Sequence, residues 1–301
     1  MDEFALINTF VAQFDVAAPP RGPGDDCAVL PRLGPSCVTT DAVVEGVHFT
    51  RKFSLEDVGH KALAVNLSDL AAMGARPTWF TVALGLPDAL TALDVKKLGA
   101  GMAALARTHG AELVGGNLTR SLQLSVTVTL SGALEGPPLL RSRAEAGDSL
   151  YVSGPVGDAA AGLRAKNAQL VNAQRRPTPH LTFGRLARGL CSAEIDVSDG
   201  LAQDLEHLCR ASGVGAELES GDLPLSDALL TFAGSRKAAL PFALRGGEDY
   251  VVLVAVRRVG QFEAAMKKAG FSANRIGWLT EGSGVKLDGL PLAGPLGFKH
   301  R

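Results

Sequence analysis

Apolar and polar residues alternate strictly along one stretch of the first half of the chain. Leu122, Leu124, Val126, Val128 and Leu130 are each separated by one polar residue. Successive side chains of a strand point to opposite faces, so the alternation predicts a half-buried strand over 122–130 with one face on a core.

Apolar residues at helical spacing predict two helices that flank further strand-like segments. The first covers 54–73, opens with Ser54 in a capping arrangement and stops at Gly74. The second covers 91–109 and ends before Gly110. The first half therefore mixes strands with helices.

The pattern restarts after the Gly-Pro-Pro at 136–138, which places a domain boundary near residue 140 and predicts domains over 1–140 and 141–301. The second half predicts, in order, a strand near Tyr151, a strand ending near Val197, a helix over 201–208, a strand over 251–256 and a helix over 262–268. Between the first two strands, the polar stretch 167–179 is interpreted as a mobile loop.

Composition supports two compact domains and excludes several partner classes. The chain has 301 residues, of which 46% are hydrophobic and 20% charged, with a formal net charge of −1. This near-neutral charge and the lack of a Lys/Arg cluster argue against nucleic acid as a partner. The acidic start and the shortness of the densest apolar run argue against a secretory leader or a membrane span, so we expect a cytoplasmic protein.

The four cysteines show no metal-site or redox spacing. No C-x-x-C pair occurs, so we interpret them as reduced, buried thiols. They are Cys27, Cys37, Cys191 and Cys209.

Carboxylates gather in five short segments, which we place at turn-rich junctions beside glycines. One such carboxylate commonly caps backbone N–H groups, but five together indicate a site. The segments are 22–26, 39–41, 66–69, 196–200 and 246–250.

Asp69 needs a partner from outside its own predicted helix. It falls on the apolar stripe of Val58, Ala62 and Val65, and no Lys or Arg lies one turn away. A buried carboxylate costs several kcal/mol unless it is paired or metal-bound. The partner is therefore expected from another element or from a cation.

A predicted hairpin brings Asp26 and Asp41 to one end of a sheet. The strand-like segments 28–30 and 38–40 are joined through a Gly-Pro at 34–35. Oxygen-only ligands crowded in this way suit Mg²⁺, which bridges carboxylates to substrate phosphates.

Nucleotide-binding and nucleophile motifs are absent from the sequence. Neither a P-loop nor a G-x-G-x-x-G fingerprint occurs, and no Ser-His-Asp or Cys-His catalytic set can be recognised. Phosphates would then be held through metal. Asp199 and Gly200 are expected to cap the helix that begins near Leu201, whose N-terminal amides would alternatively attract a phosphate.

Six ordered motifs resemble the thiamine-monophosphate kinase family, within the superfamily of aminoimidazole ribonucleotide synthetase. The resemblance spans nearly the whole chain, although any one motif alone would be weak evidence. The motifs are GPGDDCAVL at 22–30, TTDAVVEGVHF at 39–49, KALAVNLSDLAAMGARP at 61–77, GGNLTR at 115–120, DVSDGL at 196–201 and GGEDY at 246–250.

The resemblance implies roles for individual residues. The implied metal ligands are Asp26, Thr39, Thr40, Asp41, Asp69, Asn117, Asp196 and Asp199. The implied ATP contacts are Gly116, Asn117, Arg141 and Ser198, and the implied thiamine phosphate contacts are His48, Glu248 and Phe298. Without the resemblance, His48, Arg141 and Phe298 would be read as an ordinary turn or core histidine, a surface charge and a packing residue.

Two positions depart from the family pattern. Asn117 stands where the family usually has a metal-binding aspartate, and Phe298 where it often has Trp or Tyr. Asn117 remains an oxygen ligand without the charge, so we expect weaker binding at one metal position. Phe298 keeps a stacking face and loses the polar tip, so we expect an effect on substrate affinity more than on rate.

The activity implied is the ATP-dependent phosphorylation of thiamine monophosphate, the final step of thiamine diphosphate biosynthesis. Mg²⁺ ions anchored by Asp26, Asp41, Asp69 and Asp196 would support direct in-line transfer, with no side-chain nucleophile and no phosphoenzyme. One alternative is another ATP-dependent synthetase of the superfamily, forming aminoimidazole ribonucleotide or selenophosphate. The other is a non-catalytic nucleotide-binding homologue.

The architecture expected from the pattern and the resemblance together is α/β (α+β). An N-terminal mixed sheet with covering helices would bind metal and ATP, and a C-terminal α+β sandwich would complete the active site. The resemblance also implies a homodimer joined through the N-terminal sheets, which would protect open sheet edges.

Overall fold

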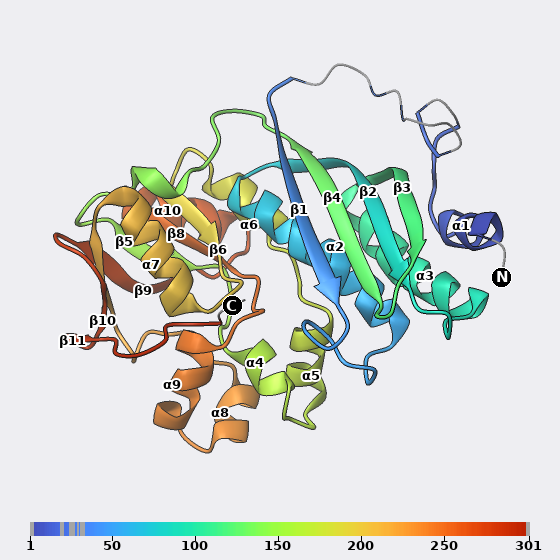
Figure 1. Ribbon diagram of the computed structural model, residues 1–301. Coiled ribbons are helices and arrows are strands. Elements are labelled where there is room, and N and C mark those ends of the chain that lie inside the picture. Colours follow the sequence, from blue (N-terminus) through green and yellow to red (C-terminus); the bar gives the residue numbers. More distant parts are fainter. Residues whose placement is uncertain (1–2, 19–20, 24–27, 29, 31–33, 299–301) are drawn as a thin grey trace. The chain divides into compact units, whose positions relative to one another are not determined.

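The computed structural model describes residues 3–18, 21–23, 28, 30 and 34–298. The chain divides into two compact units, each with its own sheet (Figure 1). The first contains Met1–Leu70 and Arg76–Glu135, and the second contains Ala71–Ala75 and Gly136–Arg301. The two units are described in turn.

The first unit is built on a four-stranded mixed sheet with the order β1-β4-β2-β3. β4 pairs antiparallel with β1 and β2, whereas β2 and β3 run parallel. The strands are β1 Ser36–Val44, β2 Arg76–Leu86, β3 Glu112–Arg120 and β4 Ser125–Ala133. Among the described strands, β1 and β3 are therefore the two outer ones of this sheet.

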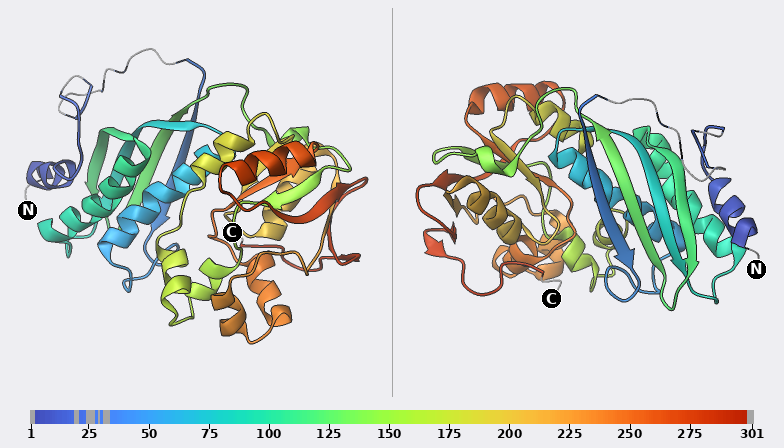
Figure 2. Two further views of the ribbon diagram at one scale, coloured as in Figure 1. Left: turned by 180° about the vertical axis from the view of Figure 1, so that it is seen from behind. Right: turned by 45° about the horizontal axis from the view of Figure 1, so that its top comes forward.

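Two long helices, α2 Leu55–Ala72 and α3 Ala92–His109, cover one face of this sheet (Figure 2). Both begin and end where the sequence predicts. The Ser54 hydroxyl accepts from the Asp57 N–H at 3.1 Å, and Thr91 forms a capping box at the start of α3. α1 Glu3–Val11 packs against α3, and Phe14 reaches the ring of Phe80 at a centroid distance of 6.0 Å.

The second unit is built on a seven-stranded mixed sheet with the order β11-β10-β7-β9-β5-β8-β6. Its strands are β5 Ser149–Val152, β6 Ala193–Asp196, β7 Gly215–Leu218, β8 Val252–Val256, β9 Asn274–Thr280, β10 Val285–Leu287 and β11 Leu290–Pro291. Its helices are η1 Arg141–Arg143, α4 Asp158–Gly162, α5 Ala168–Arg175, α6 Leu181–Ala187, α7 Leu201–Ser212, α8 Asp227–Ala233, α9 Arg236–Arg245 and α10 Val259–Lys268.

Helices pack on both faces of the second sheet. Leu150 of β5 belongs to the core cluster that includes Leu205 of α7, whereas the neighbouring Tyr151 contacts Phe262 of α10 at 5.0 Å between ring centroids. Adjacent strand residues face opposite sides, so α7 and α10 lie on opposite faces. Together with the first unit, this layered arrangement confirms the expected α/β (α+β) class, with a mixed sheet in each unit.

The strand predicted over 122–130 begins three residues later than expected. β4 starts at Ser125, and Leu122 is 97% exposed in the turn after β3, whereas Val126, Val128 and Leu130 are fully buried. Leu122 therefore fits the alternating pattern only by coincidence. β4 begins at Ser125, where its hydrogen bonding to β1 and β2 begins.

The stretch 167–179 was expected to be a mobile loop, and that expectation is wrong for most of it. Asn167 accepts N–H bonds from Gln169 and Leu170 and opens α5, which ends just before Arg176 and Pro177. Leu170 is fully buried and Gln174 is 3% exposed. The helix could not be predicted from the sequence, because it is short and polar. Only two of its residues face inward, which is too few to give a helical pattern of apolar positions.

No helix among the described residues is long and apolar enough to cross a membrane. Of the cysteines in the described part of the chain, Cys37, Cys191 and Cys209 are free thiols, and only Cys209 is buried. The prediction of reduced thiols is therefore confirmed for these three. The prediction that all of them are buried is wrong, because Cys37 and Cys191 are only half-buried. Cys27 lies outside the described residues.

Candidate functional site

In the first unit, a hydrogen bond links the predicted ligands Thr39 and Asp69. The Thr39 hydroxyl donates to Asp69 Oδ2 at 2.5 Å. Thr39 lies within β1 and Asp69 within α2, so neither stands at a turn-rich junction as predicted. The partner expected for Asp69 therefore comes from another element, and the covering of the sheet by α2 brings the two together.

Sheet register decides which predicted ligands of β1 share the face of Asp69. Thr39 is paired with Leu130 and Asp41 with Val128, both buried beneath the helices. Paired residues on neighbouring antiparallel strands point to the same face, so Thr39 and Asp41 face α2 and α3. Thr40 points the other way, and its hydroxyl bonds to the Val128 carbonyl and the Thr129 hydroxyl at 3.1 Å each.

Gly116 and Asn117 lie on β3, at the opposite edge of the same sheet. Asn117 is exposed and shares a row with Ala83 and Thr127, which places its side chain on the face of Thr40, away from Asp41. Two strands separate β1 from β3, about 14 Å at the usual strand spacing. The first unit of one chain therefore does not bring Asn117 to Asp41.

The Asp26 ligand and the predicted hairpin partner of β1 fall largely outside the described residues. Among the described residues, β1 pairs with β4. Asp41 is therefore held in register by β4, and the predicted hairpin with 28–30 lies largely outside the described residues and stays a prediction.

His48 lies in a turn just after β1 that is tied to a buried lysine. Its Nδ1 accepts the Val44 N–H at 3.1 Å, and its carbonyl accepts from Lys61 Nζ at 3.2 Å. Lys61 is fully buried and its ammonium lies 5.7 Å from the Phe53 ring centroid, within the range of a cation–π contact. The predicted substrate histidine is thus fixed at both its ring and its backbone.

In the second unit, Asp196, Ser198 and Asp199 lie on the turn between β6 and α7. Asp196 ends β6 and is 4% exposed. Asp199 and Gly200 were expected to cap α7. Gly200 is the N-cap residue, and no side chain caps the helix from that position. Instead, Asp204 reaches back from the first turn of α7.

The Asp204 carboxylate stabilises this turn through three backbone bonds. Its Oδ2 accepts the N–H groups of Ser198, Asp199 and Gly200 at 2.9, 3.0 and 3.1 Å. Burial nonetheless raises the pKa of Asp204 to about 7, because the N–H bonds only partly offset the loss of water around the charge. Sequence reasoning missed Asp204, although a carboxylate in the first turn of a helix is a recognisable signal.

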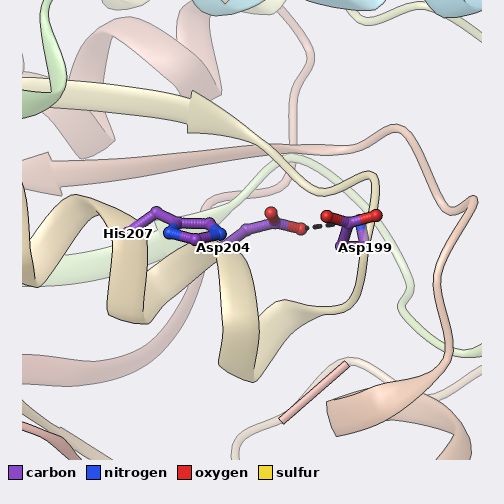
Figure 3. Close-up of side chains that lie close together, drawn as sticks. All are labelled: Asp199, Asp204 and His207. Atoms are coloured by element: carbon purple, nitrogen blue, oxygen red, sulfur yellow. Dashed lines mark hydrogen bonds between the residues drawn. The ribbon is translucent and has the colours of Figure 1, made fainter. Parts of the chain in front are cut away.

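His207 lies one turn after Asp204, and ligand atoms of Asp199, Asp204 and His207 lie within 4.8 Å of one another (Figure 3). Because Asp204 Oδ2 already receives three N–H donors, the chemistry of Asp204 is that of a helix cap. The trio does not by itself indicate a cation site.

The segment 246–250 runs against this turn and presents Glu248. The Glu248 N–H donates to the Ser198 carbonyl at 2.7 Å, and the Tyr250 N–H to the Val197 carbonyl at 2.8 Å. Both residues have positive φ, 71° and 51°, a backbone conformation uncommon outside glycine. A Cβ on Gly247 would lie 2.5 Å from the Ser198 carbonyl oxygen. The positive φ values and the close approach of Gly247 to the Ser198 carbonyl together indicate that the fold holds this segment in one conformation, as is common at functional sites.

Two further polar residues secure this segment: Asp249, which the sequence placed in it without a role, and Gln174, which the sequence missed. Both Asp249 oxygens accept N–H groups at the start of α4, from Gly157 at 2.7 Å and Ala159 at 3.2 Å. Burial raises the pKa of Asp249 to about 8. From α5, the Gln174 amide donates to Glu248 Oε2 at 3.3 Å. The helix once expected to be a loop therefore supports a predicted substrate residue.

Phe298 packs beside Asp199 at the end of the described chain. Its N–H donates to the Asp199 carbonyl at 3.0 Å, and its side chain helps line a cleft of about 620 Å³ in the second unit. Gln203, Glu206, His207 and Arg210 of α7 line the same cleft. Arg141 lies in η1 and is exposed, and its carbonyl accepts from the Ser212 hydroxyl at 2.6 Å.

Comparison with known proteins covers both units. The family model described as AIR synthase related protein, N-terminal domain, matches residues 24–134, and the corresponding C-terminal domain model matches residues 145–289. The thiamine-monophosphate kinase of Salmonella typhimurium is 38% identical, over 96% of this chain and 95% of that protein.

Solved structures give the same picture. The crystal structure of thiamine-monophosphate kinase from Stenotrophomonas maltophilia K279a is 38% identical with a TM-score of 0.86, covering 97% of this chain and 98% of that one. AaThiL complexed with AMPPCP and TMP is 34% identical with a TM-score of 0.81, covering 88% of this chain and 87% of that one.

Proposed function

This chain belongs to the thiamine-monophosphate kinase family, within the AIR synthase related proteins, and we propose that it makes thiamine diphosphate from thiamine monophosphate and ATP. The observation that carries this conclusion is the similarity over nearly the full length to thiamine-monophosphate kinases, one of which is solved with AMPPCP and TMP. The enzyme is thus an ATP-dependent phosphotransferase.

We propose Mg²⁺ as the metal, and the donor chemistry of the chain fits it. Thr39, Asp41 and Asp69 offer oxygens on one face of the first unit, and Asp196 offers a buried carboxyl in the second. Hard oxygen donors without nitrogen or sulfur suit Mg²⁺. When bound, Mg²⁺ supplies neutralisation of phosphate charge.

The residues position two phosphorylated substrates, and no side-chain nucleophile is needed. A phosphate monoester has a second pKa near 6, so the acceptor oxygen is already ionised at neutral pH. We assign Gly116, Asn117, Arg141 and Ser198 to ATP, and His48, Glu248 and Phe298 to thiamine monophosphate. The fixed turn at His48 and the strained backbone at Glu248 support this, because preorganised groups favour in-line transfer.

We also propose a homodimer formed through the N-terminal sheets. β1 and β3 are the two outer strands of that sheet among those described, and the predicted metal ligands Asp41 and Asn117 lie on these two strands. Dimerisation would cover strand edges that are otherwise open to pairing.

The test of the activity is the formation of thiamine diphosphate from thiamine monophosphate and ATP, with Mg²⁺ and then with excess EDTA. Product that depends on metal and does not form from unphosphorylated thiamine would support the proposal. Bound ATP without product would exclude it and favour a non-catalytic homologue.

The dimer is tested by the molar mass of the protein in solution, measured by light scattering over a range of protein concentrations. A mass of about twice that of one chain would support the dimer. The mass of a single chain at every concentration would refute it.

A further inference from the structure

One glutamine of α7 links Phe298 to the turn that carries Asp199. Gln203 Nε2 donates to Asp199 Oδ2 at 2.9 Å and to the Phe298 carbonyl at 2.9 Å. Asp199 is a predicted metal ligand and Phe298 a predicted substrate contact. A single amide group therefore contacts both sides of the proposed site.

The orientation of this amide follows from its neighbours. Both contacts of Gln203 are acceptors, a carboxylate and a carbonyl, so only the NH₂ end of the side chain satisfies them. The contact with Asp199 involves an ionised partner, which makes it one of the stronger kinds of hydrogen bond. No other uncharged side chain of this length presents two N–H donors from one atom.

The backbone of residues 297–298, the tail of the described chain, also packs closely against the start of α7. A Cβ on Gly297 would lie 2.5 Å from the Asp199 carbonyl oxygen and 2.8 Å from Gln203 Cβ, so a side chain at this position is excluded. The Phe298 N–H adds a bond of 3.0 Å to the same Asp199 carbonyl. Asp199, Gln203 and Phe298 line one cleft, and the backbone of Phe298, from which its ring projects, is tied to Asp199 and Gln203.

We propose that Gln203 is a positioning residue that couples the substrate side of the site, through Phe298, to the metal side, through Asp199. This role rests on the proposed function, in which these two residues contact thiamine monophosphate and metal. Gln203 fixes the Asp199 carboxylate and the Phe298 backbone relative to each other, so loosening one loosens the other.

The primary variant is Gln203→Met, which keeps the length and volume of the side chain and removes both donors. The matched control is Gln261→Met, at an exposed position of α10. Hydrogen exchange of the 290–298 segment is expected to speed up about tenfold or more in Gln203→Met, with melting temperature and exchange elsewhere unchanged. The control is expected to match wild type throughout.

The kinetic readout separates positioning from simple packing. In Gln203→Met, the KM for thiamine monophosphate is expected to rise about tenfold, and the Mg²⁺ concentration for half-maximal rate to rise with it. In a Phe298→Ala background, the same substitution should raise KM no further, because the coupled ring is gone. A full, additive rise in that background would overturn the coupling.

A second variant, Gln203→Glu, keeps the shape of the side chain and replaces the donor by a charge. The introduced carboxylate would face the Asp199 carboxylate and the Phe298 carbonyl, which are both acceptors, so Gln203→Glu is expected to raise KM more than Gln203→Met. Wild-type exchange and wild-type KM in both variants would refute the proposal. An inactive wild-type protein would instead refute the proposed function, and the exchange data would still decide whether Gln203 holds the tail.

Discussion

At the scale of single residues, the Thr39 hydroxyl orients the Asp69 carboxylate across the gap between strand and helix. Thr39→Val removes this bond and keeps the shape of the side chain. A hydrogen bond to an ionised group is worth about 1.5–3 kcal/mol, so the Mg²⁺ concentration for half-maximal rate should rise about tenfold or more. Magnesium titrations of the kinase reaction measure this.

Thr40→Val is the matched comparison. Thr40 is also an implied metal ligand, but its hydroxyl bonds to β4 on the other face of the sheet, so Thr40→Val should raise the magnesium requirement less than Thr39→Val. Equal effects at the two positions would contradict the assignment of Thr39 alone to the orientation of Asp69.

The missing charge at Asn117 is also expected to affect metal binding. Asn117→Asp restores a full negative charge at a position where the family usually has aspartate, so we expect tighter metal binding and a faster reaction at limiting Mg²⁺. Rates of the two proteins across Mg²⁺ concentrations check this. Indistinguishable curves would show that the lost charge is without consequence.

The enclosed carboxyl of Asp249 makes stability depend on pH. Its pKa is raised from 3.8 to about 8, so the folded protein holds a proton that the unfolded chain has released. Stability from this group is complete below about pH 4 and is lost as pH rises through about 8. Asp249→Asn removes this titration. Denaturant unfolding at pH 5 and pH 8 should show wild type losing about 1–3 kcal/mol relative to the variant. A constant difference between the two proteins would contradict the raised pKa.

At the scale of elements, α5 supports the strained segment that presents Glu248. Gln174 is buried and donates to Glu248, whereas Gln169 on the same helix is exposed and contacts Asp158. Gln174→Met should raise the KM for thiamine monophosphate several-fold, because Glu248 loses its partner.

Gln169→Met serves as the control on the same helix and should leave KM near the wild-type value. Steady-state kinetics with varied thiamine monophosphate compares the two. A similar rise in both variants would indicate that α5 acts through its general stability and not through Glu248.

At the scale of the whole molecule, the short segment 71–75 belongs to the second unit although α2 begins in the first. Arg188 donates to the Gly74 carbonyl at 2.9 Å, and a Cβ on Gly184 would lie 2.0 Å from the Ala71 carbonyl oxygen. Gly184→Ala should therefore destabilise the protein by about 2–4 kcal/mol.

Gly260 in α10 has open space around its Cβ position, so Gly260→Ala should be neutral or stabilise by up to about 1 kcal/mol. Thermal or denaturant unfolding of both variants measures the contrast. Equal stability of the two would contradict the close packing of α6 on the 71–75 segment.

The sequence by itself determined the elements whose signals are local. The ends of α2 and α3 follow from capping residues and glycines, and the strand core at Val126, Val128 and Leu130 follows from period-two alternation. The candidate carboxylates were found because they gather in five short segments, and the six motifs that resemble one family then implied roles for them. Both signals are continuous in the chain.

Only the tertiary structure decided what depends on register and on long-range contacts. A shift of one residue along β1 exchanges the faces of Thr39 and Thr40, and no local pattern fixes that register. The contact of Thr39 with Asp69 and the link of Gln203 to Phe298 join residues that are far apart in the sequence, so their sequence spacing carries little signal. The short polar helix α5 forms because two of its side chains find buried contacts, which the chain alone does not reveal.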